Sequence, residues 1–305
     1  MKRYLSLWSI VILCILTVLC FSGCNRIKKD SDVSKLEQFT FEEESAGITI
    51  TGYDGSAKTI EIPDELDGKQ VTKIKAMAFY KKRGVLKIIV PDSVKEIEAS
   101  AFEACVDLKE IIFPESLKKM GSGILKDCID LEKITFPENL EELPMSALEN
   151  CNLMTELELP PNLIRIGRRA FSSMSSLKGI DLPDSVIYIG DEVFESCSSL
   201  ERVKISQSLT SLPYRAFAFC EKLQQIEIPD NIEIIGEFAF GNAGLRRLFV
   251  PATVKIIEKE AFYGCSDLEK VELSEGLERI DSTAFWDCGT RAVYPESATV
   301  DWSNQ

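Results

Sequence analysis

The chain contains 10 cysteines, and they are its residues best suited to chemistry, because a thiolate is a nucleophile and a metal ligand and two thiols can form a disulfide. Most of them fall in one column of a repeating pattern, called here the cysteine column: Cys105, Cys128, Cys151, Cys197, Cys220, Cys265 and Cys288. Met174 and Ala243 occupy two further positions of this column, which favours buried thiols that pack as hydrophobic groups. A disulfide ladder or a metal-thiolate cluster is the alternative. The odd number of thiols, and side chains that would run parallel in register, argue against both.

Other residue types offer no recognisable catalytic site. The sequence has no histidine, which removes the usual proton-transfer residue near neutral pH and the commonest nitrogen ligand of zinc. Carboxylate pairs are numerous because the chain is acidic, and the sequence contains no glycine-rich phosphate loop, Cys-x-x-Cys pair or EF-hand loop. We therefore expect no catalytic residue, no metal site and no cofactor, and we expect that the protein is not an enzyme.

Length and composition describe a folded protein that would repel nucleic acid. The chain has 305 residues, of which 45% are hydrophobic and 28% are charged. Lys and Arg total 35 whereas Asp and Glu total 49, which gives a formal net charge of -14. Because the average surface would repel a polyanion, we exclude DNA and RNA as partners.

The first residues predict export across a membrane. Lys2 and Arg3 precede an uncharged apolar stretch that ends at Phe21, the arrangement of a secretory signal. The next residues complete the string Phe-Ser-Gly-Cys, ending at Cys24, which resembles the bacterial lipobox. The resemblance implies that residues 1–23 are removed, that Cys24 is acylated and that the protein is lipid-anchored. An uncleaved anchor helix is the alternative, and both hypotheses place the remaining chain in an extracytoplasmic compartment.

An internal repeat occupies most of the remaining chain. One apolar column, called here the phenylalanine column, recurs every 23 residues with a single step of 22: Phe79, Phe102, Leu125, Leu148, Phe171, Phe194, Phe217, Phe240, Phe262 and Phe285. Nine and eleven residues after a column member stand apolar residues such as Ile111 and Phe113, and a proline such as Pro114 usually follows. This period of two predicts one short strand in each unit, and proline ends the strand because it lacks an N–H for the ladder.

Units of this size cannot enclose their own apolar faces, so they must stack. We expect a repeat solenoid of about ten 23-residue units. Its strands would form one parallel sheet, with an irregular or short helical convex side and the phenylalanine column inside. Later in several units a glycine follows an apolar pair, as at Gly121 and Gly190, and indicates a turn there.

One recurring string carries a specific family resemblance. The pattern Ile-x-x-x-Ala-Phe-x-x-Cys-x-x-Leu-x-x-Ile-x-Ile-Pro, seen between Ile97 and Pro114, resembles the BspA-like class of leucine-rich repeats. The resemblance extends from Ile60 to Pro295 and implies a leucine-rich repeat fold. It also implies a bacterial surface or secreted protein, because members of that class mostly have those locations, and the better-known ones bind host proteins or mediate adhesion. A fold resemblance does not identify the partner.

The sequence divides into five predicted parts. They are a lipoprotein signal peptide over 1–23, a flexible tether over 24–44, an N-terminal hairpin cap over 45–74, the solenoid over 75–292 and a C-terminal cap over 293–305. The caps are expected because a stack exposes apolar surface at both ends. In the N-terminal cap, alternating segments over 48–53 and 58–62 flank Asp54-Gly55 and predict a β-hairpin.

The strands also predict where a partner could bind. Positions eight and ten after the phenylalanine column point away from the core and line an exposed strand face. Two candidate features there are the apolar pair Ile89 and Ile112, and Phe249 beside Arg246 and Arg247, since aromatic residues and arginine contribute strongly to interfaces. An acidic cluster and a basic step complete the candidates: Glu156, Glu158, Asp181, Arg202 and Lys204. The alternative is that these side chains only pair across strands or are exposed without a partner.

Together these features favour a non-catalytic cell-surface lipoprotein. It would bind a protein partner through the exposed strand face, in adhesion or in contact with a host or envelope protein, and it would contact the membrane through its N-terminal lipid. Binding of a glycan, as an accessory protein of the cell envelope, is one alternative, because exposed aromatic residues such as Trp286 can stack on sugars. A spacer without a specific ligand is the other.

Overall fold

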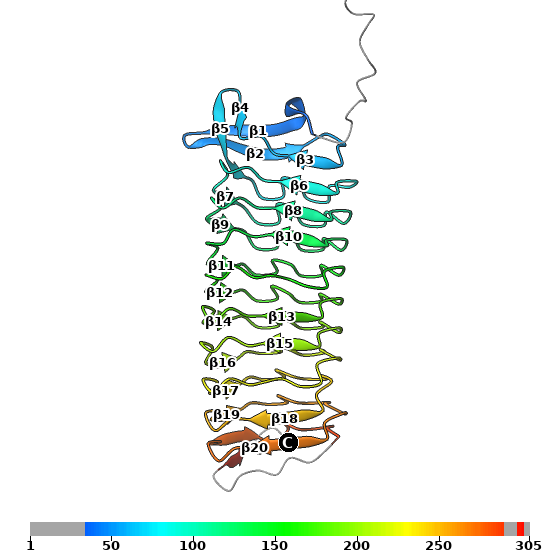
Figure 1. The fold of residues 1–305 in the computed structure, drawn as a ribbon, viewed down its shortest axis with the longest axis vertical. Helices are drawn as coiled ribbons and strands as arrows, with labels where there is room; N and C mark the ends of the chain where they lie inside the picture. The colour runs from blue at the N-terminus through cyan, green and yellow to red at the C-terminus, as the bar shows by residue number, and fades with distance from the viewer. Residues whose placement is uncertain (1–33, 290–297, 302–305) are drawn as a thin grey trace, which may run out of the picture.

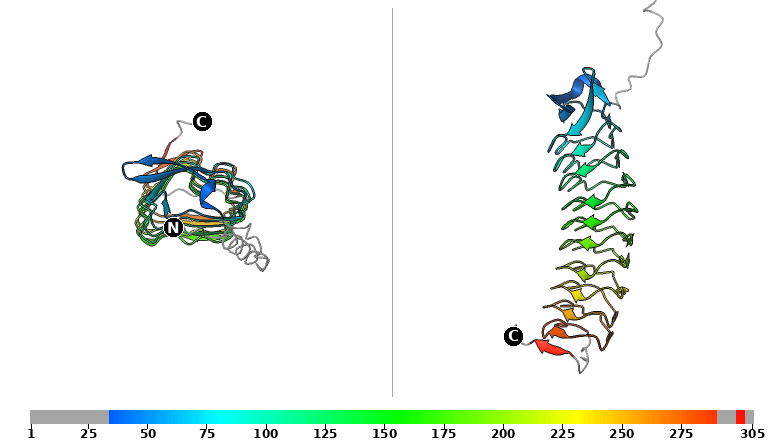
Figure 2. Two further views of the ribbon diagram at one scale, coloured as in Figure 1. Left: turned by 90° about the horizontal axis from the view of Figure 1, so that it is seen from above. Right: turned by 90° about the vertical axis from the view of Figure 1, so that its left-hand side faces the viewer.

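The computed structural model describes residues 34–289 and 298–301. Over these residues the chain winds into an elongated solenoid whose turns lie one against the next (Figure 1). The stack is gently curved, and its turns superimpose when it is viewed from the end (Figure 2). The predicted repeat solenoid with parallel strands is confirmed. Residues 1–23 and Cys24, on which the signal and lipidation predictions depend, lie outside the described residues.

Helical structure is almost absent from the described part of the chain. Its one helix is the 3-10 turn η1 (Leu36–Gln38). Within the described ranges, no helix combines the length and the apolar character that a membrane crossing requires.

Most of the strands predicted nine to eleven residues after the phenylalanine column form, together with β3 (Thr59–Glu61), what we call the first strand stack, but no strand forms around Leu157 or Ile226. Its members are β3, β6 (Lys87–Ile89), β8 (Glu110–Ile112), β10 (Lys133–Thr135), β13 (Gly179–Asp181), β15 (Arg202–Lys204), β18 (Arg247–Val250) and β20 (Lys270–Leu273). Neighbouring strands pair in parallel, but the stack is divided into three ladders: β3 to β10, β13 with β15, and β18 with β20.

A second strand stack runs beside the first along the molecule (Figure 1). Its members are β5 (Lys69–Ile74), β7 (Glu96–Ile97), β9 (Lys119–Met120), β11 (Glu142–Leu143), β12 (Arg165–Ile166), β14 (Tyr188–Ile189), β16 (Ser211–Leu212), β17 (Ile234–Ile235), β19 (Ile256–Ile257), β21 (Arg279–Asp281) and β22 (Thr299–Asp301). The expectation of one sheet is therefore corrected to two stacks. Most members of the second stack have only two residues, too few to show a period of two in the sequence.

The phenylalanine column lies inside the coil, as predicted. The rings of Phe171, Phe194, Phe217 and Phe240 are fully buried and stack with centroids 5.2–5.4 Å apart. The stacking continues to Phe285, whose ring centroid lies 4.9 Å from that of the preceding member. Burying a phenylalanine side chain contributes about 1.5–3 kcal/mol, so the column is a major source of stability in every turn.

Nearly every turn bends at two positions with left-handed backbone conformation. Around Phe102 these are Ser100 with φ 57° and Ala104 with φ 58°, and the same two positions recur in the other turns except that of Phe285, where only Asp287 has a positive φ. The bends direct some backbone N–H groups to the next turn and others to the same turn. The N–H groups of Ser100, Phe102 and Ala104 donate to carbonyls of the next turn. The N–H group of Glu103 donates to a carbonyl of its own turn. The hydrogen bonds between turns thus offset a conformation that costs a non-glycine residue about 1–2 kcal/mol.

The N-terminal cap differs from its prediction. Strand β1 (Phe39–Glu44) pairs antiparallel with β2 (Gly47–Tyr53), and β2 pairs in parallel with β5. The predicted hairpin over 48–53 and 58–62 is wrong, because β3 pairs with β6 in the first strand stack instead. The tether predicted over 24–44 is also too long, since β1 belongs to the cap. The alternation of Phe39 and Phe41 explains this strand, because Phe39 is buried with its ring centroid 5.0 Å from that of Tyr53.

At the other end, β22 extends the second strand stack by pairing in parallel with β21. It is the described part of the predicted C-terminal cap over 293–305. The remainder of that cap lies outside the described residues.

Candidate functional site

The first strand stack presents an exposed face, called here the first strand face, on which outward side chains alternate with buried ones. In β15 the side chains of Arg202 and Lys204 are exposed on either side of the buried Val203. In β18, Arg247 and Phe249 are exposed whereas Leu248 between them is buried. The outward direction predicted for these positions is confirmed, and whether a partner binds them stays a prediction.

The apolar pair at the N-terminal end of this face is only half-buried rather than fully exposed. Ile89 and Ile112 are partners in the β6–β8 ladder and lie side by side. Two residues earlier on the same strands, the Lys87 amine lies 2.6 Å from the Glu110 carboxylate. The hydrogen bond from Lys87 lowers the pKa of Glu110 and keeps that carboxylate ionised. This end of the face therefore combines two apolar side chains with satisfied charges.

The predicted acidic cluster and Arg202 of the basic step come together around one shallow hollow of about 730 Å³, which Lys204 does not line. Glu156, Glu158, Asp181 and Arg202 all line it. Asp181 forms an ion pair with Arg202, and Lys204 lies 3.7 Å from Asp184. The sequence placed these residues correctly on one surface, but the Asp181–Arg202 and Lys204–Asp184 pairs show that two of its cations are already neutralised across turns.

The third candidate region lies farther along the same face, around a hollow of about 470 Å³. Its lining residues are Glu201, Lys222, Gln224, Gln225, Arg246, Arg247 and Glu269. A second hollow of about 910 Å³ shares Glu201 and Gln225 with it and includes Phe249, which is 57% exposed. The structure thus brings Arg246, Arg247 and Phe249 together at two adjoining hollows.

Sequence reasoning missed several residues of this region. Lys222, Gln224 and the two glutamates at its edges were not among the predicted site residues. A signal was present in the one 22-residue step of the phenylalanine column, which removes a residue from the turn that leads to Arg246. Gly244 marks that turn, and a Cβ there would lie 1.9 Å from the carbonyl oxygen of Glu221, so the two backbones approach too closely for any other residue.

The second strand stack has an exposed apolar surface that the sequence pattern does not predict. Ile187 is 57% exposed and Tyr188 is 45% exposed. The guanidinium carbon of Arg165 lies 4.2 Å from the centroid of the Tyr188 ring, a cation–π contact between neighbouring turns. Tyr188 belongs to the two-residue strand β14 and Ile187 directly precedes it, and a strand of two residues is too short for alternation to reveal an outward face.

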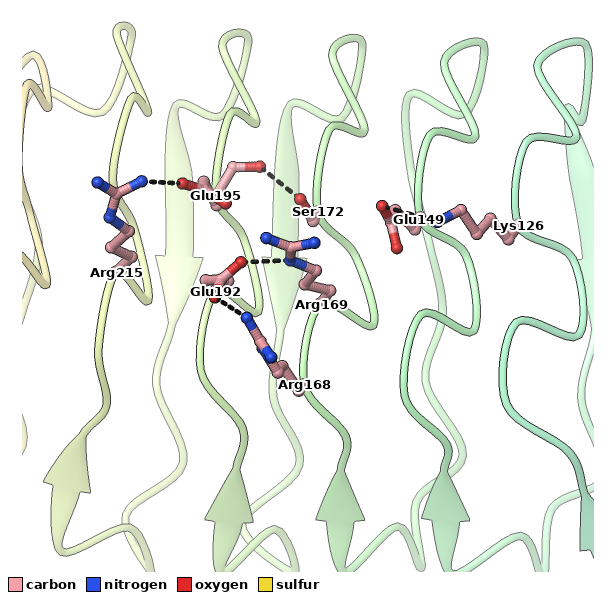
Figure 3. A network of polar contacts seen from close by, with 8 residues as sticks. All are labelled: Lys126, Glu149, Arg168, Arg169, Ser172, Glu192, Glu195 and Arg215. Carbon is pink, nitrogen blue, oxygen red and sulfur yellow. Dashed lines mark hydrogen bonds and ion pairs between the residues drawn. The ribbon is translucent and has the colours of Figure 1, made fainter.

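The titratable residues inside the coil are engaged in structural contacts. Glu192 is buried, and both of its carboxylate oxygens form ion pairs with Arg168 and Arg169 of the preceding turn (Figure 3). Burial alone would raise the pKa of Glu192, but the hydrogen bonds from the two arginines outweigh it and lower the pKa. A carboxylate held ionised with both oxygens occupied is typical of a structural ion pair rather than of an acid–base catalyst.

The cysteine column consists of free thiols, as predicted. Six of its members are buried and Cys288 is half-buried. Burial raises the pKa of Cys105 and Cys197 to about 12, so neither is a thiolate near neutral pH. Over residues 34–289 and 298–301, no group of three or more acidic or cysteine side chains is placed to hold a metal ion.

Comparison with known proteins supports the repeat architecture. A family model described as the BspA type leucine rich repeat region matches residues 72–201 and 187–301, with 6 copies. No curated protein matches the chain. Among solved structures, a leucine rich repeat protein of T. pallidum is 26% identical and aligns over 68% of this chain and 88% of its own, with a TM-score of 0.50. A leucine-rich repeat protein from Bacteroides ovatus is 21% identical and aligns over 86% of this chain and 88% of its own, with a TM-score of 0.54.

Proposed function

The chain belongs to the BspA-type leucine-rich repeat family, and we propose that it is a non-catalytic cell-surface protein that binds a protein partner through the first strand face. The observation that carries this proposal is the exposure of Phe249. Its side chain is 57% exposed on a regular strand, beside Arg246 and Arg247 and at the edge of a hollow. An exposed aromatic residue surrounded by arginines and an open hollow is typical of an interface hot spot.

The arrangement of the face supports binding rather than catalysis. Its outward side chains are spread over consecutive turns, so they contact a partner over a wide surface instead of converging on one reacting atom. The fold is a rigid coil whose core is filled by the phenylalanine column, and such solenoids present long surfaces to other macromolecules. Binding to a protein, in adhesion or in contact with a host or envelope protein, is the function that this geometry fits best.

A photo-crosslinking experiment tests the proposal. Phe249 is replaced by benzoylphenylalanine, which has a similar shape, and the protein is irradiated on intact cells. A control protein carries the same group at the exposed Glu142 of the second strand stack. We expect one protein to be captured from position 249 and not from position 142. The captured protein is then purified, and its affinity for the Phe249→Asp variant should be at least tenfold lower than for the parent. This substitution removes an apolar contact and introduces a charge.

A second substitution on the face and a stability measurement show whether a loss of affinity reflects local unfolding. Ile112→Ser alters the other apolar feature of the face, and Ile187→Ser makes the same change on the second strand stack as the control. All variants should keep the thermal unfolding temperature within a few degrees of the parent. Undiminished affinity in both Phe249→Asp and Ile112→Ser would contradict the assignment of binding to the first strand face.

We also propose that the protein is held outside the cytoplasm by a lipid on Cys24. The sequence around Cys24 and the basic, apolar segment before it support this anchoring. Cells fed a clickable palmitate analogue should label the protein, and Cys24→Ala should abolish the label and leave the precursor uncleaved. Label in the Cys24→Ala protein, or a mature protein that keeps Met1, would contradict it.

Binding of a glycan is a second candidate because Trp286 is 49% exposed at a turn. An indole ring with one open face can stack on a sugar ring. A glycan array probed with the full chain tests this candidate, with Trp286→Ala as the matched variant. Glycan binding that depends on Trp286 and not on Phe249 would favour it over protein binding.

A further inference from the structure

The first strand stack is interrupted at two turns, between β10 and β13 and between β15 and β18, and the second interruption adjoins the third candidate region. In the regular turns a backbone N–H donates to the carbonyl of the preceding turn, as from Glu201 to Lys178 at 2.8 Å and from Glu269 to Arg246 at 2.9 Å. Within the described chain, no backbone N–H from Gln224 to Ile228 donates to another residue. The ladder is therefore interrupted between β15 and β18, and both hollows of the third candidate region adjoin this interruption.

Among the described residues, the opening between β15 and β18 gathers three cations without ion pairs, whereas most cations on the rest of the face are paired and the unpaired Lys178 stands alone at the hollow of about 730 Å³. Lys87, Arg202, Lys204 and Lys270 each form an ion pair with a carboxylate. Lys222, Arg246 and Arg247 form none with any residue that the structure describes. Three cationic groups thus converge on one hollow with their hydrogen-bonding capacity directed to solvent, in a protein whose net charge is -14. An unpaired guanidinium group presents a planar set of donors that matches a carboxylate.

The same opening also offers apolar and amide groups. Phe249 stands at the edge of the adjoining hollow with more than half of its side chain exposed. Gln224 and Gln225 line the first hollow with side-chain amides, which can donate to a carbonyl and accept from an N–H. Free main-chain N–H groups over 224–228 add further donors. Donors and acceptors of this kind suit the peptide groups of a bound polypeptide.

We propose that this opening, called here the arginine hollow and lined by Lys222, Gln224, Gln225, Arg246 and Arg247, binds an acidic peptide segment of the protein partner. The segment would place a carboxylate against Arg246 and Arg247 and a neighbouring apolar side chain against Phe249. This inference rests on the proposed function and assigns the chemistry of the partner. According to this inference, the ionic contacts with the partner are made by Arg246 and Arg247, which belong to one turn of the face.

The charges at the edges of the arginine hollow favour a peptide over an anionic glycan. Glu201 and Glu269 line the same hollow on the turns before and after the cations. A polysaccharide with a negative charge on successive sugars would place some of these charges against the two glutamates, at an electrostatic cost. A polypeptide can instead present one carboxylate with neutral or basic residues beside it. The arrangement of cations and glutamates around the arginine hollow therefore fits a peptide better than a polysaccharide with repeated negative charges.

A random peptide library tests the proposal. Twelve-residue peptides displayed on phage are selected against the immobilised full chain, and the enriched sequences are synthesised with a fluorescent label. We expect enrichment of Asp or Glu next to an aromatic or aliphatic residue. The affinity of these peptides should fall at least tenfold for the double variant R246A/R247A, because each arginine supplies a charge-assisted contact.

Matched variants make the result specific. The double variant K58A/R83A also removes two exposed cations but lies away from the arginine hollow, and it should leave the affinity unchanged. The variant R246K/R247K keeps both charges and loses the planar donor arrangement, so we expect an intermediate loss. Added salt should weaken binding to the parent and have little effect on R246A/R247A.

The outcomes separate this inference from the proposed function. Peptides that lose affinity in Ile112→Ser or Phe249→Asp but keep it in R246A/R247A would overturn the arginine hollow and leave the first strand face as the binding surface. Peptides unaffected by any variant of the face would overturn both. Selection of neutral or basic peptides, the absence of any enriched peptide, or an anionic glycan that alone depends on Arg246 and Arg247 would each overturn the peptide assignment.

Discussion

The Sγ atom of Cys197 lies 3.1 Å from the backbone carbonyl oxygen of Phe171, one turn earlier, and donates its S–H to it. The other members of the cysteine column make the same bond to the column residue of the preceding turn, for example Cys128 to Phe102 at 3.2 Å and Cys288 to Phe262 at 3.1 Å. Each thiol therefore packs as an apolar group and satisfies a buried acceptor. The recurrence of cysteine is explained by this double role, without a disulfide or a metal.

Thiol accessibility follows directly from this arrangement. We expect a maleimide reagent at neutral pH to label Cys288 rapidly in the folded protein, because Cys288 alone among the seven is half-buried. The other thiols should react only after denaturation without reductant. Mass spectrometry of the labelled protein gives the count. Rapid labelling of several thiols in the native state, or fewer than seven labels after denaturation, would contradict the structure.

The buried thiols also predict a loss of stability in alkali. Burial raises the pKa of Cys197 from an ordinary value of 9.0 to about 12. Because the folded state holds this proton while the unfolded state releases it, the stabilisation is complete below pH 9 and is lost as the pH rises toward 12. In that interval, each such thiol should lower the free energy of unfolding by about 1.4 kcal/mol per pH unit. Urea denaturation at pH 8 and pH 10 should show the advantage of the parent over Cys197→Ala shrinking by about 1 kcal/mol. The advantage over Leu200→Ala, which removes no ionisable group, should stay constant.

The buried ion pair of Glu192 predicts sensitivity to acid. Arg168 and Arg169 hold the pKa of Glu192 below its ordinary value, so its contribution to stability is present above about pH 4.5 and is lost as the pH falls through the lowered pKa. We expect Glu192→Gln to reduce the free energy of unfolding by about 1–3 kcal/mol at pH 7 and to flatten the acid limb of the stability profile. The exposed neighbour Asp191, changed to Asn, serves as the control. Equal profiles for the two variants would show that the buried carboxylate has no special role.

The phenylalanine column predicts a graded response to substitution. Leu125 and Leu148 occupy it in two turns and are fully buried there. Phe194→Leu should therefore cost about 1–1.5 kcal/mol, since the column accommodates leucine elsewhere. Phe194→Ala leaves a cavity and should cost about 3–5 kcal/mol. Chemical denaturation measures both, and a similar cost for the two variants would mean that the stacked rings are not tightly packed.

The left-handed bends predict a stabilising substitution. Ala104 has φ 58°, which an alanine adopts at a cost and a glycine does not. We expect Ala104→Gly to raise the free energy of unfolding by about 0.5–1 kcal/mol. Ala101, three residues earlier, is fully buried and is not among the positive-φ residues, so Ala101→Gly should lower it by about 1 kcal/mol. Loss of stability in Ala104→Gly would show that its methyl group packs more favourably than the backbone argument allows.

Parts of the fold could be predicted because a repeat shows the same constraint many times. The columns of Phe79 and Ile88 are evident from their spacing, and their alternation with polar residues gives the buried and exposed sides of the first strand stack. The cap is predicted less well because it is not repeated. There the sequence predicts a tether where the structure has the strand that contains Phe39, and it predicts that the turn at Asp54-Gly55 joins two strands, which instead pair with other partners.

The glycines that follow the second strand stack illustrate a different limit. The sequence indicates turns at Gly121 and Gly190, but neither has a positive φ. Their actual requirement is close approach, since a Cβ on Gly121 would lie 2.2 Å from the backbone nitrogen of Ala99 in the preceding turn. Such contacts depend on the distance between successive turns of the solenoid, and the sequence of one repeat unit does not reveal this distance.

The sequence by itself determined the repeat, the identity of the buried columns and the direction of the side chains on the first strand face, because these follow from periodicity and from the need to remove apolar groups from water. Only the tertiary structure decided which charges on that face are neutralised. Arg202 and Arg247 hold equivalent positions in their units, yet Arg202 pairs with Asp181 whereas Arg247 borders an interrupted ladder without an ion pair to any described residue. That difference depends on distances between atoms of different turns, and the packing of the whole coil sets those distances.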